Sequence, residues 1–211
     1  MGERPDRALI LDWGGVLTSP VEDSFRLWAL RHGLPLAALM RVLRRMHDTA
    51  NSPLQRVEIG DITGRDFEEC LAEEISAETG CSVAAENLLA GLFGYLETNA
   101  AVVNIVGEAE TQGWKIGILS NAWGHPYDMT FLSSVASVIL TSDEIGIRKP
   151  DIGAYRLTAD RLRVRPGNCV FVDDLRRNVR GAQAAGMTGF VYSPGAEQAL
   201  GELVRTFEGT I

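Results

Sequence analysis

The pattern of apolar and polar residues divides the chain into two textures. Short apolar runs, each ended by a polar residue or a turn, occur at residues 8–11, 115–119, 138–141, 168–172 and 189–192. Runs of this length predict buried strands of a parallel sheet. From residue 100 onward, stretches with helical periodicity lie between and after these runs, at residues 100–112, 152–162, 176–185 and 197–207. This alternation predicts an α/β fold with a Rossmann-like, doubly wound parallel sheet.

A second texture lies between residues 18 and 98. It contains no convincing strand but four amphipathic stretches, at residues 21–32, 36–47, 64–79 and 81–96. We therefore expect a helical cap of residues 18–98, inserted into a core of residues 1–17 and 99–211. Basic residues of the cap could reach an anionic substrate, although charges on helices more often face solvent; they are Arg41, Arg44, Arg45 and Arg56.

Composition narrows the range of partners. The 211 residues carry a formal net charge of -8, which disfavours nucleic acid as a partner. Three cysteines, at no metal-binding spacing, fit the reduced thiols of a cytoplasmic protein. No apolar leader precedes the first strand. We expect a cytoplasmic protein that binds neither nucleic acid nor a membrane, and the sequence does not indicate its oligomeric state.

Polar residues follow four of the predicted strands. They are Asp12, the pair Ser120 and Asn121, Lys149 in the next loop, and the pair Asp173 and Asp174. A single aspartate at a strand end more often caps a helix or shapes a turn. However, the carboxyl ends of parallel strands share one edge, where open α/β sheets bind ligands. We therefore expect these side chains to converge.

The converging residues predict a particular chemistry. Three carboxylates in one crevice repel each other, which implies a bound cation, and hard oxygen ligands favour Mg²⁺. Lys149 and Ser120 beside the metal would form a cradle for a phosphoryl group. Asp12 can then attack phosphorus as a nucleophile and form an aspartyl-phosphate. The expected partner is a small phosphorylated metabolite.

Four motifs in this order resemble those of the haloacid dehalogenase-like (HAD) hydrolase superfamily, in its helical-cap (C1, subfamily IA-like) group. The motifs are LDWGGVL at 11–17, ILSN at 118–121, RKPD at 148–151 and FVDD at 171–174, with Asn178 downstream. Each motif alone is a weak pattern, but together they cover nearly the whole chain in the expected order.

The resemblance implies roles for individual residues. It implies a mobile cap and a Mg²⁺ ion held by Asp12, by the backbone carbonyl of Gly14 and by Asp173 or Asp174. It also implies that phosphate or substrate contacts Trp13, Gly14, Gly15, Ser120, Asn121 and Lys149.

Gly14 departs from the pattern, because phosphatases of the family usually carry a second aspartate there as general acid and base. Such assistance is typically worth about 10²–10⁴-fold in rate. We therefore expect weak activity, a substrate with a good leaving group, or an acid from elsewhere. Alternatively, the turn requires glycine because φ is positive there. His125 could supply the acid, but a loop histidine more often faces solvent. Trp13 and Trp123 either floor a substrate pocket or pack under the cap.

The leading interpretation is a Mg²⁺-dependent phosphatase of small phosphomonoesters. The alternative is a catalytically impaired protein of this fold that binds a phosphorylated ligand or a protein partner. A 2-haloacid dehalogenase is more distant, because that branch is poor in acids where this chain has Asp173 and Asp174. Phosphonoacetaldehyde hydrolases need a cap lysine, and the two lysines of this chain, Lys115 and Lys149, lie outside the predicted cap.

Overall fold

A five-stranded parallel sheet forms the core of the computed structural model, which describes residues 6–125 and 127–209. The strand order is β3-β2-β1-β4-β5. The strands are β1 (Ala8–Leu11), β2 (Lys115–Ser120), β3 (Val138–Thr141), β4 (Cys169–Asp173) and β5 (Thr188–Val191). The central strand β1 is fully buried, as its continuous apolar sequence predicts. The predicted α/β fold is confirmed.

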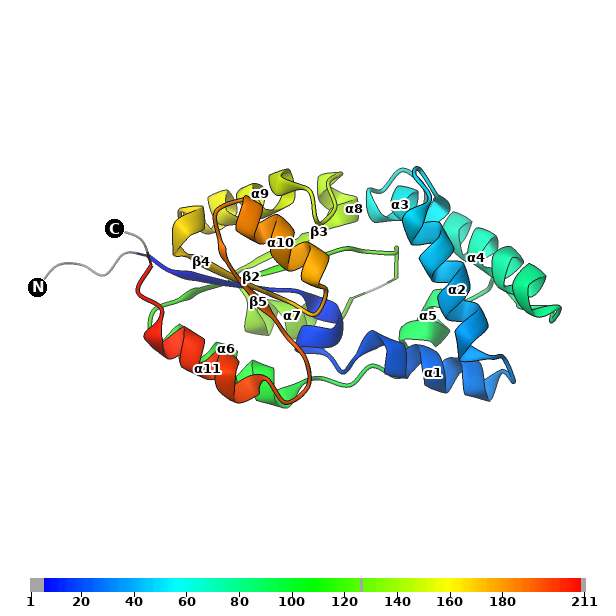
Figure 1. Cartoon of the computed structure of the whole chain (residues 1–211), viewed down its shortest axis with the longest axis horizontal. Helices are drawn as coiled ribbons and strands as arrows, with labels where there is room; N and C mark the ends of the chain where they lie inside the picture. Colours follow the sequence, from blue (N-terminus) through cyan, green and yellow to red (C-terminus); the bar gives the residue numbers. More distant parts are fainter. Residues whose placement is uncertain (1–5, 126, 210–211) are drawn as a thin grey trace, which may run out of the picture.

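Helices cover both faces of this sheet (Figure 1). One face carries α9 (Ile152–Leu162) and α10 (Arg176–Ala184), and the other carries α6 (Ala100–Thr111), α7 (Met129–Val135) and α11 (Glu197–Thr206). Successive residues of β1 point to opposite faces, so Leu9 and Leu11 join the core under α6 while Ala8 and Ile10 join the core under α9. Fully burying each leucine contributes about 1.5–3 kcal/mol.

The cap is a separate group of helices with its own hydrophobic core. It consists of α1 (Val21–Arg31), α2 (Leu36–Asp48), α3 (Pro53–Glu58), α4 (Gly64–Thr79) and α5 (Leu88–Phe93). Large apolar side chains from all of these helices pack together; they include Phe25, Leu39, Leu54, Phe67 and Leu92. These helices lie beside the sheet edge at which the strands end, on the right of Figure 1.

Two neighbouring segments connect the cap to the core. Thr18 and Thr98 form an antiparallel bridge, the Ser19 amide donates to the Glu97 carbonyl at 2.7 Å, and the Asn99 amide donates to the Leu17 carbonyl at 2.9 Å. We propose this bridge as the boundary between the cap of residues 18–98 and the core. Residues 1–5, 126 and 210–211 of the expected core lie outside the described residues.

Several helices differ from the sequence-based expectation. The helix predicted at residues 81–96 is only α5, because Asn87 before it adopts a left-handed conformation with φ 59°. Helix α3, which begins at Pro53 and is capped by the Ser52 hydroxyl, lies between two of the predicted helical stretches and was not predicted itself. Helix α7 and the short helix α8 (Ser142–Ile145) were not predicted.

Cap and core also meet at a seam of glycines. A Cβ atom on Gly64 would lie 2.6 Å from the carbonyl oxygen of Gly124, and one on Gly124 would lie 2.5 Å from the Cα of Gly64. A Cβ atom on Gly60 would lie 2.5 Å from the carbonyl oxygen of Asp143. The two backbones therefore touch without intervening side chains.

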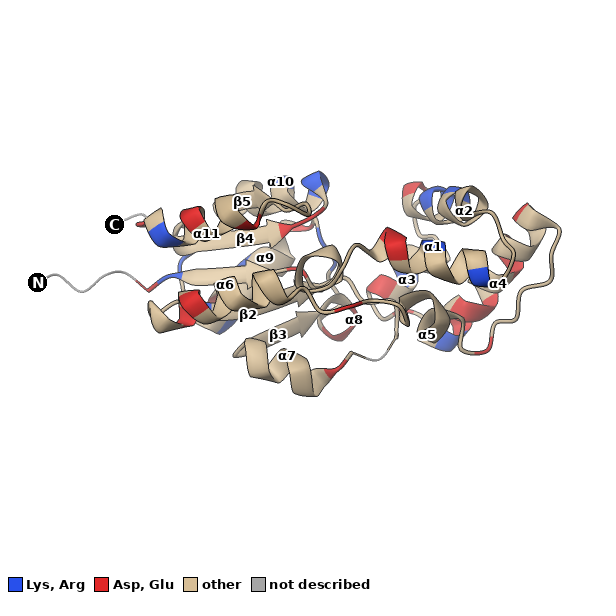
Figure 2. Ribbon diagram, turned by 90° about the horizontal axis from the view of Figure 1, so that it is seen from below, with Lys and Arg blue, Asp and Glu red and all other residues tan. Residues whose placement is uncertain are grey.

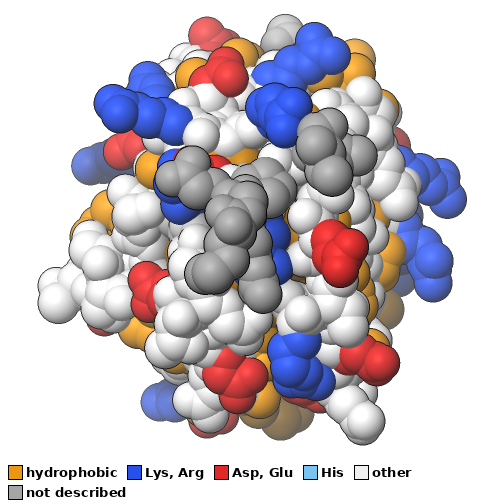
Figure 3. All heavy atoms as spheres, turned by 90° about the vertical axis from the view of Figure 1, so that its left-hand side faces the viewer, with side chains coloured by type: hydrophobic (Ala, Val, Ile, Leu, Met, Phe, Trp, Pro, Cys, Tyr) orange, Lys and Arg blue, Asp and Glu red, His pale blue; other side chains and the backbone are white. Residues whose placement is uncertain are grey.

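The end of the core opposite the cap, which faces the viewer in Figure 3, carries acidic and basic side chains side by side. Within residues 6–125 and 127–209, no helix combines the length and the apolar character needed to cross a bilayer.

The basic residues of α2 and the acidic residues of α4 are visible on the cap in Figure 2. Arg41 and Arg45 pair with Glu78 and Glu74 across these two helices.

Candidate active site

Asp12 ends the central strand and opens into a tight turn, Trp13–Leu17. Its amide donates to the Val172 carbonyl at 2.9 Å, which continues the sheet, and its carboxylate accepts the Trp13 amide at 2.7 Å. The carboxylate is buried but reaches the surface of a cavity. A strand end fixed on both sides thus aims a single carboxylate into that cavity.

The two glycines of this turn have different roles. Gly15 has φ 74°, and a Cβ atom there would lie 2.7 Å from a carboxylate oxygen of Asp174, so this position requires glycine. Gly14 has φ -70° and ψ 126°, a conformation that any residue adopts. The alternative that Gly14 itself needs a positive φ is therefore wrong. A Cβ atom on Gly14 would lie 2.9 Å from a methyl carbon of Val21, so the Val21 side chain would have to shift.

Lys149 lies between two aspartates. Its Nζ atom is 2.8 Å from a carboxylate oxygen of Asp12 and 2.8 Å from one of Asp173. The amide side chain of Asn121 clamps the lysine backbone, since it donates to the Lys149 carbonyl at 3.1 Å and accepts the Lys149 amide at 2.9 Å. Burial opposes the charged lysine, but the carboxylates of Asp12 and Asp173 hold its pKa above the ordinary value.

Asp173 and Asp174 have different surroundings. Asp173 is fully buried and accepts hydrogen bonds from the Leu175 amide, from the Asn178 side chain at 3.0 Å and from Lys149. No side chain among the described residues donates a hydrogen bond to Asp174, and Asp174 lines the cavity. Asp173 therefore organises the site from behind, while Asp174 offers a carboxylate to a ligand.

The site carries an excess of negative charge. Burial raises the pKa of Asp12 to about 8, although Lys149 opposes this shift, and the carboxylates of Asp173 and Asp174 add to it. Burial and the neighbouring Asp173 raise the pKa of Asp174 to about 6. Three carboxylates face one lysine, so a divalent cation would balance the charge and favour the ionised form of Asp12.

A magnesium ion fits these residues. One carboxylate oxygen from each of Asp12, Asp173 and Asp174 lies within 4.8 Å of the others. Oxygen donors at such separations, with a charge excess that two positive charges would cancel, suit Mg²⁺. Gly14 follows Asp12 in the same turn and also lines the cavity, so its backbone carbonyl is a further candidate ligand.

Ser120 lies at the end of β2 and lines the same cavity. Its hydroxyl is 3.0 Å from the hydroxyl of Tyr127, a residue that the sequence analysis did not select. Burial raises the pKa of Tyr127 above its ordinary value, so its hydroxyl keeps its proton and can hold the Ser120 oxygen in place. The aromatic ring of Tyr127 also packs against Trp13, at 4.8 Å between centroids.

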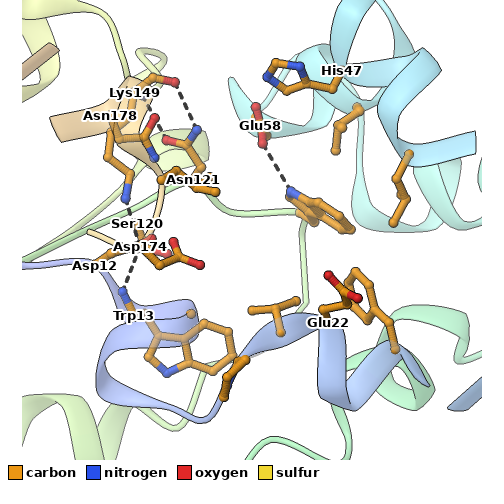
Figure 4. Close-up of a pocket in the computed structure, with 18 of the residues that line it drawn as sticks. Asp12, Trp13, Glu22, His47, Glu58, Ser120, Asn121, Lys149, Asp174 and Asn178 are labelled. Carbon is orange, nitrogen blue, oxygen red and sulfur yellow. Dashed lines mark hydrogen bonds and ion pairs between the residues drawn. The ribbon is translucent and has the colours of Figure 1, made fainter. Parts of the chain in front are cut away.

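These side chains lie on one wall of a cavity of about 730 Å³ between core and cap. Figure 4 shows Asp12, Ser120, Asn121, Lys149, Asp174 and Asn178 on one side, and Glu22, His47 and Glu58 on the other. Of the residues selected from sequence, Trp13 and Gly14 also line the cavity, whereas Gly15 and Asp173 lie behind it. The Gly15 amide is already bound to the Thr18 hydroxyl at 3.0 Å.

His125 is buried rather than solvated, so the expectation of a solvent-facing loop histidine is wrong. Its ring stacks on Phe93 at 4.0 Å and contacts Trp13 at 5.2 Å, and neither ring nitrogen has a hydrogen-bond partner among the residues that the structure describes. Burial lowers the pKa of His125 to about 4. At neutral pH the ring is therefore uncharged and holds no extra proton for a leaving group.

Trp13 and Trp123 combine the two roles that the sequence left open. Both line the cavity, and both pack against Phe93, at 6.2 Å and 5.4 Å between ring centroids. Trp123 also donates to Glu58, a buried cap residue that forms an ion pair with Arg148 of the core. Glu58 was not selected from sequence, because an isolated glutamate near the end of a short helix carries no pattern.

The cap arginines divide into two groups. Arg41, Arg45 and Arg56 pair with acidic residues on the surface of the cap, as the solvated alternative predicts. Arg44 lines the cavity instead. One basic residue of the cap therefore lies at the mouth of the site.

Comparisons with known proteins agree with this architecture. The model of the haloacid dehalogenase-like hydrolase family matches residues 7–186. Phosphatase MT3486 of Mycobacterium tuberculosis (strain CDC 1551 / Oshkosh) is 30% identical over 198 residues, which cover 87% of this chain and 86% of that protein.

Two solved structures share the fold. A HAD family enzyme from Bacteroides thetaiotaomicron, in complex with magnesium and inorganic phosphate, superposes with a TM-score of 0.63 at 17% identity and covers 90% of this chain and 96% of its own. The 2-haloacid dehalogenase from Pseudomonas syringae pv. Tomato DC3000 superposes with a TM-score of 0.56 at 18% identity. The match covers 89% of this chain and 86% of the dehalogenase chain. Since the family model spans most of the sequence and a relative matches along nearly its whole length, the chain belongs to the haloacid dehalogenase-like hydrolases.

Proposed function

We propose that this hydrolase is a Mg²⁺-dependent phosphatase that cleaves small phosphomonoesters through an aspartyl-phosphate at Asp12. The observation that carries the proposal is the cluster of Asp12, Asp173 and Asp174 beside Lys149, of which Asp12, Asp174 and Lys149 line a cavity. The similarity to a protein named as a phosphatase supports it. We also propose that the chain belongs to the helical-cap, subfamily IA-like group.

In this mechanism a carboxylate oxygen of Asp12 attacks phosphorus, and the bond from phosphorus to the substrate oxygen breaks. Lys149, 2.8 Å from the attacking carboxylate, neutralises charge on the transferring group. Ser120 and the backbone of the turn after Asp12 contact the phosphoryl oxygens. Asp12, Asp174 and the Gly14 carbonyl would hold Mg²⁺, which supplies electrostatic stabilisation of the developing charge. Water then hydrolyses the aspartyl-phosphate and regenerates the Asp12 carboxylate.

The leaving oxygen needs a proton, and the side chain that would donate it at position 14 is absent. Gly14 has no side chain, and His125 is neutral. Burial raises the pKa of Glu58, but its carboxyl group is engaged by the ion pair with Arg148 and by the hydrogen bond from Trp123. We therefore propose that turnover is slow for alkyl phosphates and faster for aryl phosphates, whose oxide leaves without a proton.

The missing acid at Gly14 also favours a second candidate function, in which this protein binds a phosphorylated ligand or a protein partner without turnover.

With either function, we propose that the protein acts in the cytoplasm, since Cys70, Cys81 and Cys169 are free thiols.

A phosphatase screen with and without Mg²⁺ tests the proposal. We expect hydrolysis of 4-nitrophenyl phosphate that requires Mg²⁺ and is lost in Asp12→Asn. Saturable binding of phosphate or vanadate by a wild-type protein without any turnover would instead support the second candidate. Activity that survives in Asp12→Asn would remove Asp12 as the nucleophile.

A further inference from the structure

The cap wall of the cavity differs in chemistry from the core wall. Its apolar side chains come from four helices: Val21 and Phe25 of α1, Met40 and Leu43 of α2, Leu54 of α3 and Phe93 of α5. All of them belong to the hydrophobic core of the cap or pack against it. The cap core therefore continues to the surface of the cavity.

The polar side chains of this wall are engaged or lie at its rim. The Glu58 carboxylate forms an ion pair with Arg148 and accepts a hydrogen bond from Trp123 at 3.1 Å. Glu22, Arg44 and Asp48 are exposed, and the half-buried His47 has its Nδ1 atom 3.0 Å from the Asp48 carboxylate. A sugar phosphate buries several hydroxyls, each of which needs a partner, because an unpaired buried polar group costs about 1–3 kcal/mol. The cap wall supplies few such partners at depth.

Aromatic rings connect the nucleophile to this wall. Trp13, next to Asp12, lies 6.2 Å from Phe93, which lies 5.4 Å from Trp123 and 5.5 Å from Phe25. Phe25 and Trp123 are 6.0 Å apart. The cavity thus combines charged groups at Asp12 with an apolar surface on the cap wall, within a volume typical of pockets for small organic ligands.

We propose that the substrate is a phosphomonoester whose alcohol carries an apolar group, an aliphatic chain or an aromatic ring, seated against Phe25, Met40 and Leu43. This inference rests on the proposed phosphatase function. The phosphate lies at Asp12 and Lys149, and the apolar group replaces water on the cap wall. Apolar burial is the source of selectivity, since about 0.8 kcal/mol per methylene corresponds to about fourfold in affinity.

A series of n-alkyl phosphates from methyl to octyl, compared with glucose 6-phosphate, tests this proposal. We expect kcat/KM to rise about two- to fourfold per methylene until the cavity is filled, mainly through a lower KM, because the contact is made equally before and during the reaction. A flat series, or a preference for the sugar phosphate, would overturn the inference while leaving the phosphatase function intact.

A matched pair of variants locates the effect. Met40→Gln places an amide of similar length on the cap wall, and Leu30→Gln makes the same type of change at a leucine that is 76% exposed and outside the cavity. We expect the ratio of kcat/KM for octyl over methyl phosphate to fall about tenfold in Met40→Gln and to stay at the wild-type value in Leu30→Gln. Equal ratios in both variants would remove Met40 from the binding wall.

Binding without turnover separates failure of this inference from failure of the proposed function. Octylphosphonate and methylphosphonate can be titrated against wild-type protein by the fluorescence of Trp13 and Trp123, which line the cavity. Octylphosphonate should bind at least tenfold more tightly. This result in a protein that hydrolyses none of the phosphates would sustain the apolar pocket and reject the phosphatase, whereas equal binding would reject the apolar pocket.

Discussion

The two walls of the cavity are held in different ways. On the core wall the side chains fix one another, since Lys149 bridges Asp12 and Asp173 and Asn121 clamps the lysine backbone. On the cap wall, Phe25, Leu43 and their neighbours are held only by packing. Reacting groups must be placed to within a fraction of an ångström, whereas apolar contacts tolerate volume-conserving change. A phosphatase on this plan would keep its chemistry on the core and vary its substrate on the cap.

Lys149→Met is the harshest test of the core wall. It leaves two buried carboxylates without their cation, so we expect the free energy of unfolding to fall by about 3–5 kcal/mol and turnover to fall by about 10²–10³-fold. Urea unfolding and steady-state kinetics measure these effects. Lys115→Met is the control, because the partly exposed Lys115–Asp6 pair contributes at most about 1 kcal/mol. Equal stability of the two variants would show that Lys149 does not neutralise the cluster.

Variants of Asp173 and Asp174 separate metal binding from structural support in the core part of the site. Asp174→Asn removes a carboxylate to which no described side chain donates a hydrogen bond, so Mg²⁺ affinity should fall about 10²-fold with little loss of stability. Asp173→Asn should lower the melting temperature as well, because Lys149 and Asn178 lose their charged acceptor. Calorimetric titration with Mg²⁺ and thermal melts test both variants. If both bind Mg²⁺ as tightly as wild type, the proposed metal site does not exist.

His125 lies where the two walls meet, and it gives a pH test. Its pKa in the folded protein is lowered to about 4 from an ordinary 6.5. The unfolded chain therefore binds more protons between these values, and stability is lost as the pH falls through this window. His125→Phe keeps the stacking on Phe93 but has no group that titrates. When the pH is lowered from 7 to 4.5, we expect the free energy of unfolding to fall by about 2 kcal/mol less in this variant than in the wild type. Urea denaturation at the two pH values measures this difference. An equal fall in the free energy of unfolding in wild type and variant would show that His125 is not buried in its neutral form.

Gly14→Asp is the mildest of these changes. The backbone at Gly14 accepts a side chain, although Val21 of the cap must move. If proton donation limits turnover, the variant should narrow the gap between aryl and alkyl phosphates by about tenfold, below the 10²–10⁴-fold typical of a well-placed acid. Relative kcat/KM values, read beside a thermal melt, measure this. Equal wild-type rates on both substrate types would show that another group already donates the proton.

Sequence alone predicted most of the core and the convergence of its polar residues. The reason is that a parallel strand is a short apolar run and its polar end is visible in the sequence, as at Asp12 and Asp173. It did not reveal that Asn121 clamps a backbone or that Asp173 lies behind Asp174, because these facts depend on side-chain directions.

The cap was predicted only as a set of helices. Its wall combines Phe25, Met40, Leu54 and Phe93 from four separate helices, and no sequence spacing relates such positions. The burial of His125 was also missed, since a loop position gives no periodicity from which to infer that Phe93, far away in sequence, stacks on its ring. Contacts between helices, rather than local patterns, decide this half of the site.

The glycine seam separates the size of the cavity from its lining. Because Gly64 and Gly124 bring the two backbones into direct contact, cap and core are spaced at a point outside the lining of the cavity. A methyl group at position 64 would lie 2.6 Å from the Gly124 carbonyl oxygen, so one of the two backbones would have to shift. The breadth of substrates and their polarity can thus evolve independently, the first by a single change at the seam and the second by exchanges along the wall.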